Sequence, residues 1–588
     1  MSSLDDLFKK PALPSNKRKL EAARDPNEIY KAAKLSSSGH VKSNGKAPAV
    51  AEDEDDDVEA GPSAPSDDEK DYGPDIPDDE EGRFFGGGIT EKESEILDYM
   101  EGQEAAEIAP EKIDSAWLRK LALNFEKRIS KNAELRAKFE DDPQKFMGSE
   151  ADLDADIKAL SILTEHPQLY GEFAKLGCVA SLVGLLTHEN TDIAIDVAEI
   201  LSELTDIDVE VKEDQWDQFV DAMLEADLLD LLLSNFGRLD EANESDRSGV
   251  YHALSLLDNL VSKGTLAENI GQDTRLLEWL LSRIQKKDSP VSQNMQYSAE
   301  VLSVLVLGSS TTLRKLCELN GVDLLLQIVA AYRKRNPCTG SDEEEFVENI
   351  FDLLTCLVDE PEGKQKFVEA EGIELCLIMI REGKMSKPRA LRLLDHALAK
   401  QSGAEACEKL VEAAGLKVLF GTFMKKQNGE TMEHLLGIFS SLLRLLPANS
   451  SGRIRTLAKF VEKDYEKLEK LVKLRRVYAA KVDAMEKEIR IEQFQMDAEE
   501  REEMADEWLE RRMDAGLFCL QTIDVILAWL VAEDDGANTK IRSLLADRDE
   551  GLSVVKATIQ EQLDIIDEYS EEQTWTKDML STLIQFLT

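Results

Sequence analysis

The sequence predicts an all-α solenoid, and three observations support this fold class. The chain has 588 residues, too many for one hydrophobic core, and 42% of them are hydrophobic. From about Trp117 onward, apolar residues recur at a spacing of three to four, which is typical of amphipathic helices. One phrase, KLGCVASLVGLLTHENTDIAIDVAEIL over residues 175–201, returns in altered form along the chain. Recurrence of this kind indicates units that bury their apolar faces by stacking on one another.

Each copy of the phrase contains a short helix, a turn and then a Leu- and Val-rich helix. The turn positions are Gly177, Asp227, Asp273, Gly321, Gly372 and Gly415, separated by 43 to 51 residues. This spacing is slightly above the period of roughly 40–47 residues in HEAT and armadillo units. We expect the glycines to allow the chain to reverse, because glycine has no Cβ. With a polar turn and a third amphipathic helix in each unit, the sequence predicts an armadillo/HEAT-like α-solenoid.

The two ends of the chain differ from the repeats. The predicted domains are a disordered acidic tail over 1–108, capping helices over 109–150, repeats over 151–450 and a helical C-terminal region over 451–588. The tail is rich in Ser, Pro, Gly and charge, which favours disorder. Residues 453–515 lack Gly and Pro, and we expect two helices there with a break near 494–500. This region would cap the last repeat, and a seam for a homodimer is the alternative.

Two segments of the tail carry concentrated charge. Lys17, Arg18 and Lys19 form a short basic cluster, which suits capture by a nuclear import receptor, although a cluster can also arise by chance. Residues 52–81 are strongly acidic. Blocks of like charge often act as interaction tails, and a spacer that only increases solubility is an equal alternative.

The composition limits the classes of partner. A formal net charge of -48 argues against direct binding of nucleic acid, which depends on Lys and Arg, and favours basic protein partners. The seven cysteines form no CxxC pair, so we expect reduced thiols in the cytosol or nucleus. No run approaches the ~18 apolar residues of a membrane span, so no membrane partner is expected.

The sequence offers no catalytic or metal-binding pattern. The six histidines are scattered, without a second His or Cys at metal-ligand spacing, and GxSxG is absent. We therefore expect a binding protein rather than an enzyme, without cofactor or metal.

The third-helix stretches resemble those of armadillo proteins, in which this helix lines a concave groove. The stretches are EILSEL (199–204), SLLDNL (255–260), EVLSVL (300–305) and DLLTCL (352–357). The importin-alpha group has a pattern like WALSNL there, whose Trp and Asn clamp basic peptides. In this chain the Trp positions hold Glu199, Ser255, Glu300 and Asp352, and the Asn positions hold Glu203, Asn259, Val304 and Cys356.

Carboxylates thus replace the tryptophans, and a row of them attracts Lys- and Arg-rich segments. We expect the peptide-binding residues to be Glu199, Glu203, Asn259, Glu300 and Asp352. The alternative is that these carboxylates only keep the helix face hydrated.

The motifs LDDLFKK and GRFFGGGIT, and the pattern of almost the full chain, resemble the beta-catenin-like protein 1 family of nuclear armadillo proteins. The resemblance implies location in the nucleus and association with the spliceosome through the NineTeen complex. It also implies binding to basic, localisation-signal-like segments of nuclear splicing proteins, and thus a non-enzymatic scaffold for pre-mRNA splicing. An importin-alpha-like nuclear transport adaptor is the alternative, which the missing Trp/Asn ladder weakens.

Overall fold

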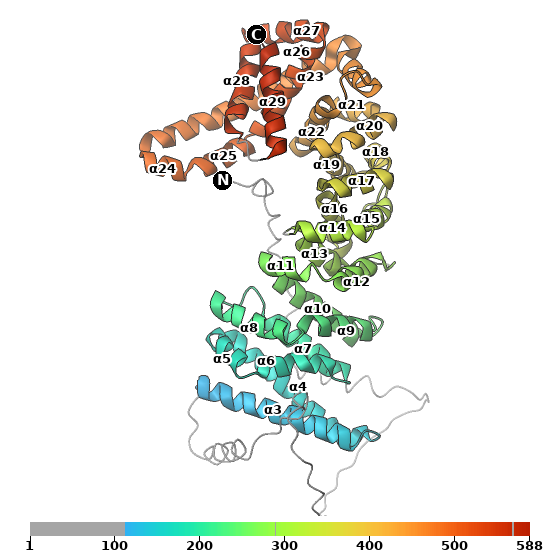
Figure 1. Cartoon of the computed structure of the whole chain (residues 1–588), viewed down its shortest axis with the longest axis vertical. Coiled ribbons are helices and arrows are strands. Elements are labelled where there is room, and N and C mark those ends of the chain that lie inside the picture. Colours follow the sequence, from blue (N-terminus) through green and yellow to red (C-terminus); the bar gives the residue numbers. More distant parts are fainter. Residues whose placement is uncertain (1–111, 289, 308, 567–569, 588) are drawn as a thin grey trace, which may run out of the picture. The chain divides into compact units, whose positions relative to one another are not determined.

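The computed structural model describes residues 112–288, 290–307, 309–566 and 570–587. The predictions for the tail, including Lys17, Arg18 and Lys19, lie outside these residues. Over the described part of the chain every regular element is a helix, as the all-α prediction requires. The first of these helices are α3 (Ser115–Lys138) and α4 (Met147–Ala159), which pack on each other and precede the repeats (Figure 1).

Six three-helix units follow within the described residues, and each contains one copy of the recurring phrase. The first helices are α5 (Tyr170–Lys175), α8 (Glu213–Glu225), α11 (Gly264–Ile270), α14 (Ser310–Glu318), α17 (Pro361–Glu369) and α20 (Ala404–Glu412). The second helices are α6 (Cys178–Gly184), α9 (Leu228–Arg238), α12 (Thr274–Gln285), α15 (Gly321–Ala330), α18 (Gly372–Glu382) and α21 (Gly415–Phe423). The third helices are α7 (Thr191–Leu204), α10 (Glu244–Val261), α13 (Gln293–Leu307), α16 (Asp342–Asp359), α19 (Ser386–Leu398) and α22 (Gly429–Leu445). These units form the predicted armadillo-type solenoid.

The third helices stack in chain order. Helix α7 packs on α10, α10 on α13, α13 on α16, α16 on α19 and α19 on α22 (Figure 1). We call these six helices the third-helix row. Each helix of the row buries most of its apolar residues, so that neighbouring repeats share one core.

The turn between the first and second helices differs from the prediction in three repeats. The residues with positive φ there are Asn320, Glu371 and Ala414, each one position before the glycine. The glycine is needed instead because the first helix lies too close. A Cβ on Gly321 would lie 2.8 Å from the carbonyl oxygen of Leu316, and one on Gly415 would lie 2.6 Å from Leu410 Cδ1. Of the four turn glycines only Gly177 has the predicted left-handed conformation, with a φ of 79°, and Asp227, the turn residue of the second repeat, is left-handed as well, with a φ of 60°.

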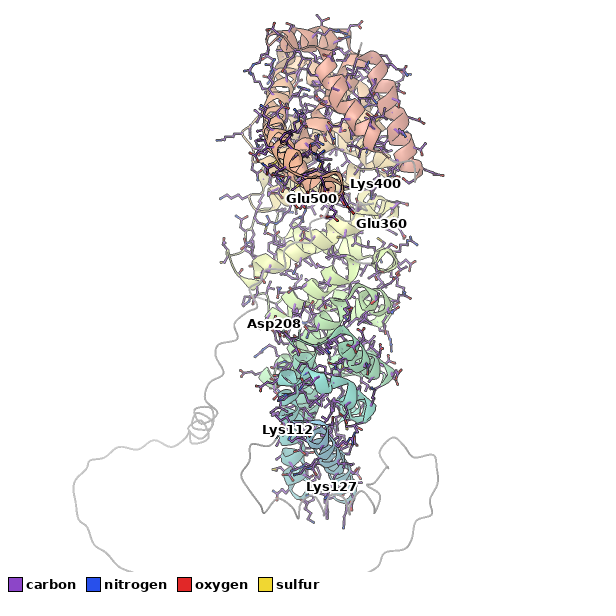
Figure 2. All side chains as sticks on the ribbon, turned by 90° about the vertical axis from the view of Figure 1, so that its left-hand side faces the viewer. Lys112, Lys127, Asp208, Glu360, Lys400 and Glu500 are labelled. Carbon is purple, nitrogen blue, oxygen red and sulfur yellow. The ribbon has the colours of Figure 1, made fainter. Side chains whose placement is uncertain are left out.

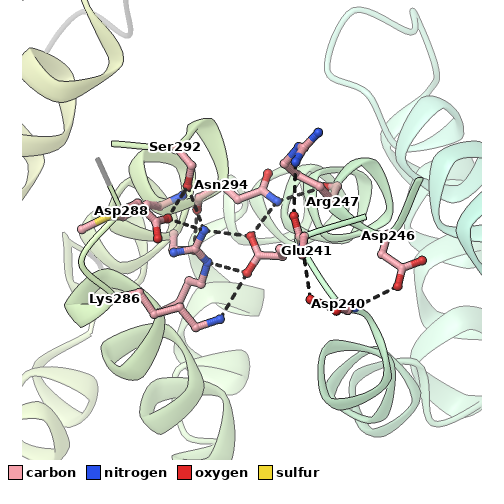
Figure 3. Close-up of polar contacts among 12 residues, drawn as sticks. Asp240, Glu241, Asp246, Arg247, Lys286, Asp288, Ser292 and Asn294 are labelled. Atoms are coloured by element: carbon pink, nitrogen blue, oxygen red, sulfur yellow. Dashed lines mark hydrogen bonds and ion pairs between the residues drawn. The ribbon is translucent and has the colours of Figure 1, made fainter. Parts of the chain in front are cut away.

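A buried ion pair joins the third repeat to the loop of the second (Figure 3). Arg283 of α12 is 3% exposed, and its Nε lies 2.7 Å from Glu241 Oε1 in the loop before α10. The other oxygen of Glu241 accepts hydrogen bonds from Arg283 Nη2, at 2.8 Å, and from Asn294 Nδ2 of α13, at 3.1 Å. Because one carboxylate receives donors from two helices, it fixes the spacing of adjacent repeats.

The C-terminal helices cover the last repeat. They are α23 (Ser451–Gln495), α24 (Ala498–Glu503), α25 (Ala505–Asp514), α26 (Leu517–Glu533), α27 (Asp535–Ala546), α28 (Leu552–Ile565) and α29 (Glu571–Phe586). Helix α26 packs on α22 and on α23, and the Arg444 guanidinium of α22 lies 5.3 Å from the ring centre of Trp575 in α29. The region therefore caps the solenoid, as a repeat array requires.

Helix α23 ends at Gln495, within the predicted break, and it is also interrupted earlier. Lys463, Asp464 and Tyr465 have φ values of 55°, 53° and 64°, so the chain makes a left-handed turn inside the segment. Beyond this turn, Arg475 donates hydrogen bonds of 2.7 and 3.1 Å to Asp524 of α26, which has no exposed surface. This buried pair ties the second part of α23 to the centre of the cap.

No single helix among the described residues has both the length and the apolar character needed to cross a bilayer. Two bent helix pairs meet the criterion by length and composition only, and one of them contains α26.

Candidate peptide-binding face on the third-helix row

The first two carboxylates predicted from the sequence lie together on α7. Glu199 Oε1 is 3.8 Å from His252 Nε2 of the next third helix, α10. The side-chain carboxylate of Glu203 receives no hydrogen bond or ion pair from the described residues, whereas its backbone carbonyl accepts one from the Asp206 N–H at 3.3 Å. Partial burial raises the pKa of Glu203, and repulsion by Glu199 one helical turn away adds to this increase. Both effects disfavour the charged form of Glu203, and a cation bound beside it would stabilise the ionised carboxylate.

Asn259 lies on the row, but both hydrogens of its amide are used within the protein. Its Nδ2 donates to the Ser202 carbonyl oxygen at 2.9 Å and to Thr205 Oγ1 at 3.2 Å, both at the end of α7. These bonds join adjacent repeats. The sequence predicted a peptide-clamping amide, and the structure shows that its donors hold α10 against α7.

Asp258, next to Asn259, is a member of the face that the sequence analysis missed. Burial raises its pKa to about 7, repulsion by Glu300 of α13 acts in the same direction, and a hydrogen bond from the Tyr297 hydroxyl, at 3.4 Å, opposes them. Glu300 itself accepts a hydrogen bond of 2.8 Å from Gln296. Asp258 is the fourth residue of SLLDNL, but the importin-alpha pattern has its peptide-clamping amide at the following position, Asn259. The structure thus brings Glu199, Glu203, Asp258 and Glu300 onto three successive third helices, where they form an acidic face that we call the α7–α13 face.

Asp352, the last predicted residue, lies in a different environment. Its carboxylate forms an ion pair with Arg392 of α19, and Glu348, one turn earlier on α16, accepts a hydrogen bond of 2.6 Å from Arg389 Nε. Cations of α19 therefore already neutralise these two carboxylates of α16. The sequence contains a signal for this pair, because Arg392 occupies the Trp position of the next copy, RLLDHA.

The same compensation continues toward the last repeats. Lys400 Nζ lies 2.8 Å from Asp359 Oδ2. Figure 2 labels Lys400 and also Glu360, which follows Asp359 in the chain. Burial alone would raise the pKa of Asp359, but hydrogen bonds from His396 and Lys400 hold it below its usual range. His434 Nδ1 of α22 lies 3.0 Å from Asp395 Oδ2. The row therefore divides into two parts. On α16–α22 the carboxylates named above each contact a basic residue on or just after the next third helix. On α7–α13, by contrast, no Lys or Arg among the described residues pairs with Glu203 or Asp258.

Other chemistry is not apparent on the described residues. No group of three or more His, Cys, Asp or Glu side chains there is placed to hold a metal ion. Six of the seven cysteines are buried or half-buried, none is paired in a disulfide, and Cys338 is exposed.

The six stacked units and their charged third helices define an armadillo-repeat protein of the scaffold class. The profile described as "Catenin-beta-like, Arm-motif containing nuclear" matches residues 94–560, and the chain belongs to this family. The Schizosaccharomyces pombe protein named Beta-catenin-like protein 1 homolog is 40% identical over 467 residues, which cover 79% of this chain and 81% of that protein. Human Beta-catenin-like protein 1 is 36% identical over 465 residues, covering 76% and 82%. Among solved structures, a designed armadillo repeat protein matches 45% of this chain and 99% of its own length, with 17% identity and a TM-score of 0.33.

Proposed function

We propose that this protein is a non-enzymatic scaffold of the nucleus that binds Lys- and Arg-rich, localisation-signal-like segments of splicing proteins and so takes part in pre-mRNA splicing. The observation that carries the proposal is the α7–α13 face. Its carboxylates lie on successive repeats, burial or mutual repulsion disfavours the charge of two of them, and Glu203 receives no cation from the described residues. A basic segment laid across the repeats would supply the missing positive charges.

Membership of a family described as nuclear supports the nuclear location. The resemblance noted from the sequence supports the further step, association with the NineTeen complex of the spliceosome. Import would use Lys17, Arg18 and Lys19 and an import receptor. Replacing these three residues with Ala should move a tagged protein toward the cytoplasm, and unchanged nuclear accumulation would show that another signal or partner carries it.

Peptide titration tests the binding face directly. Titrating the full chain with a Lys/Arg-rich peptide should show a loss of affinity of about tenfold or more when Glu199 and Glu203 are both replaced by Lys. The loss follows because attraction becomes repulsion at two positions, each pair being worth about 0.2–1 kcal/mol. The affinity should also fall as salt rises, since the contacts are partly exposed.

The matched control places the same charge change elsewhere. Glu225 and Glu268 lie exposed at first helices α8 and α11, and their replacement by Lys should leave the affinity within about twofold of wild type. If both double variants lose affinity equally, the peptide responds to net charge and the face has no special role. Affinity purification from nuclear extract then separates the scaffold, which retains spliceosomal proteins, from a transport adaptor, which retains an import carrier.

A further inference from the structure

The loops between the second and third helices of the last three repeats carry a concentration of positive charge. These loops are 331–341, between α15 and α16; 383–385, between α18 and α19; and 424–428, between α21 and α22. Their basic residues, with those of the adjoining first turn of α19, include Arg333, Lys384, Lys387, Lys425 and Lys426, which we call the basic belt. In a chain with 118 Asp and Glu against 70 Lys and Arg, such a cluster is unexpected.

Direct contacts connect the three loops to one another. The Met385 backbone N–H donates to Asn336 Oδ1 at 3.2 Å, which joins the first loop to the second. Lys334 Nζ lies 3.0 Å from Glu382 Oε2 across the same junction. The second and third loops are brought together because the helices that flank them pack in pairs, α18 on α21 and α19 on α22. The belt is therefore one continuous strip across three repeats.

Two carboxylates next to the belt already have partners. Glu382 pairs with Lys334 and with Arg381, and Glu343 pairs with Arg335 and accepts a hydrogen bond from the Tyr332 hydroxyl. For the five belt residues, by contrast, no carboxylate partner occurs within the described residues. The belt thus keeps its charge available.

One nearby lysine shows what a purely structural role looks like. Lys470 of α23 donates to the carbonyl oxygens of Phe423 and Lys425 at the end of α21, where a cation satisfies the helix C-terminus. The belt residues make no such bonds. Lys387 is half-buried, and burial together with repulsion by Lys425 lowers its pKa. Holding these cations together costs free energy that a bound anion would offset.

We propose that the basic belt binds an extended, Asp- and Glu-rich segment of a partner protein. The belt spans two steps between neighbouring helices, each about 10 Å, so about six to seven extended residues at ~3.3 Å each would follow it. The aromatic side chains at the belt are Tyr332 and Phe423, and both are buried, so neither offers a face on which nucleic acid bases can stack. An acidic polypeptide fits this strip of point charges better than RNA.

The experiment uses the full chain and a fluorescein-labelled oligoglutamate of about twelve residues as the probe, with fluorescence anisotropy as the readout. Replacing Lys425 and Lys426 with Glu should weaken binding at least fivefold. The matched control replaces Lys127 and Lys131 of α3, which are exposed and change the net charge equally; it should bind within about twofold of wild type. Unchanged circular dichroism confirms that both variants are folded.

Three outcomes would overturn the proposal. The first is absence of measurable binding of oligoglutamate to the wild-type chain. The second is equal weakening in the belt and control variants, which would show a response to overall charge alone. The third is tighter binding of a single-stranded oligouridylate of the same length than of oligoglutamate to the wild-type chain, together with loss of oligouridylate binding in the belt variant. This result would make the belt a nucleic acid site.

Discussion

Removing the cations of α19 should extend the acidic α7–α13 face by one repeat. Arg389 and Arg392 neutralise Glu348 and Asp352, and their replacement by Gln releases both carboxylates while keeping much of the side-chain volume. The side chains of Arg392 and Asp352 are 29% and 40% exposed, so each pair falls in the range of surface ion pairs, about 0.2–1 kcal/mol. Two carboxylates offered to a basic peptide would therefore add about 0.4–2 kcal/mol, which is about 2- to 30-fold in affinity.

Peptide length makes this prediction specific. From α7 to α16 there are three steps of about 10 Å, so a Lys/Arg-rich peptide needs about nine extended residues to reach the released carboxylates. Isothermal titration should show the gain for a peptide of about twelve residues and little gain for one of about five. Arg490 of α23 and Arg501 of α24 provide the control, since their replacement by Gln changes the net charge equally. A gain of the same size in the control, or no dependence on peptide length, would refute the division of the row into two parts.

Three further predictions concern stability and pH. Arg475→Met should lower the free energy of unfolding by about 3–5 kcal/mol, because it leaves Asp524 buried without its partner. Adding Asp524→Leu should restore the free energy of unfolding, measured in denaturant melts, to near or above the wild-type value. Equal loss in the single and the double variant would contradict this reasoning. Ala414→Gly should raise the thermal midpoint of unfolding. Removing the Cβ from this left-handed residue relieves about 1–2 kcal/mol of strain, and the greater flexibility of glycine in the unfolded chain cancels only about 0.5–1 kcal/mol of that gain. The pKa of Asp258, about 7 in the fold against 3.8 ordinarily, means that its contribution to stability is complete below pH 3.8 and is lost as pH rises through about 7. Affinity for a basic peptide should therefore rise between pH 6 and 8, and Asp258→Asn should flatten that rise; a persisting rise would assign it to another group.

Much of the architecture could be predicted from the sequence because it depends on local patterns. The three-to-four spacing of apolar residues and the recurring phrase identified all six units and the third helices on which Glu199, Glu203 and Glu300 lie. The break after Gln495 also followed from the composition. Such features arise from residues close in the chain, and their physical causes are visible there.

The structure differs from the sequence-based predictions where the role of a residue depends on a partner far away in the chain, or where one residue type suits more than one role. Glycine suits both a positive φ and a close approach, so the sequence could not show that Gly321 serves the second purpose. The interruption of α23 at Lys463–Tyr465 contains neither Gly nor Pro and gave no signal. The partner of Asp352 is 40 residues away, and only the stacking of α16 on α19 brings Arg392 to it.

The close-approach glycines have an evolutionary consequence. Gly321 would collide with Leu316, Gly372 with Phe367 and Gly415 with Leu410, in each case five positions earlier. Each constraint is contained in one unit, so a duplicated or transplanted unit would bring its own solution with it. The ion pairs from α16 to α19 join different units instead, and shuffling the units would break them. Such a chain could lengthen by duplication of whole repeats, whereas the ion pairs between neighbouring repeats favour keeping the existing repeats in their present order.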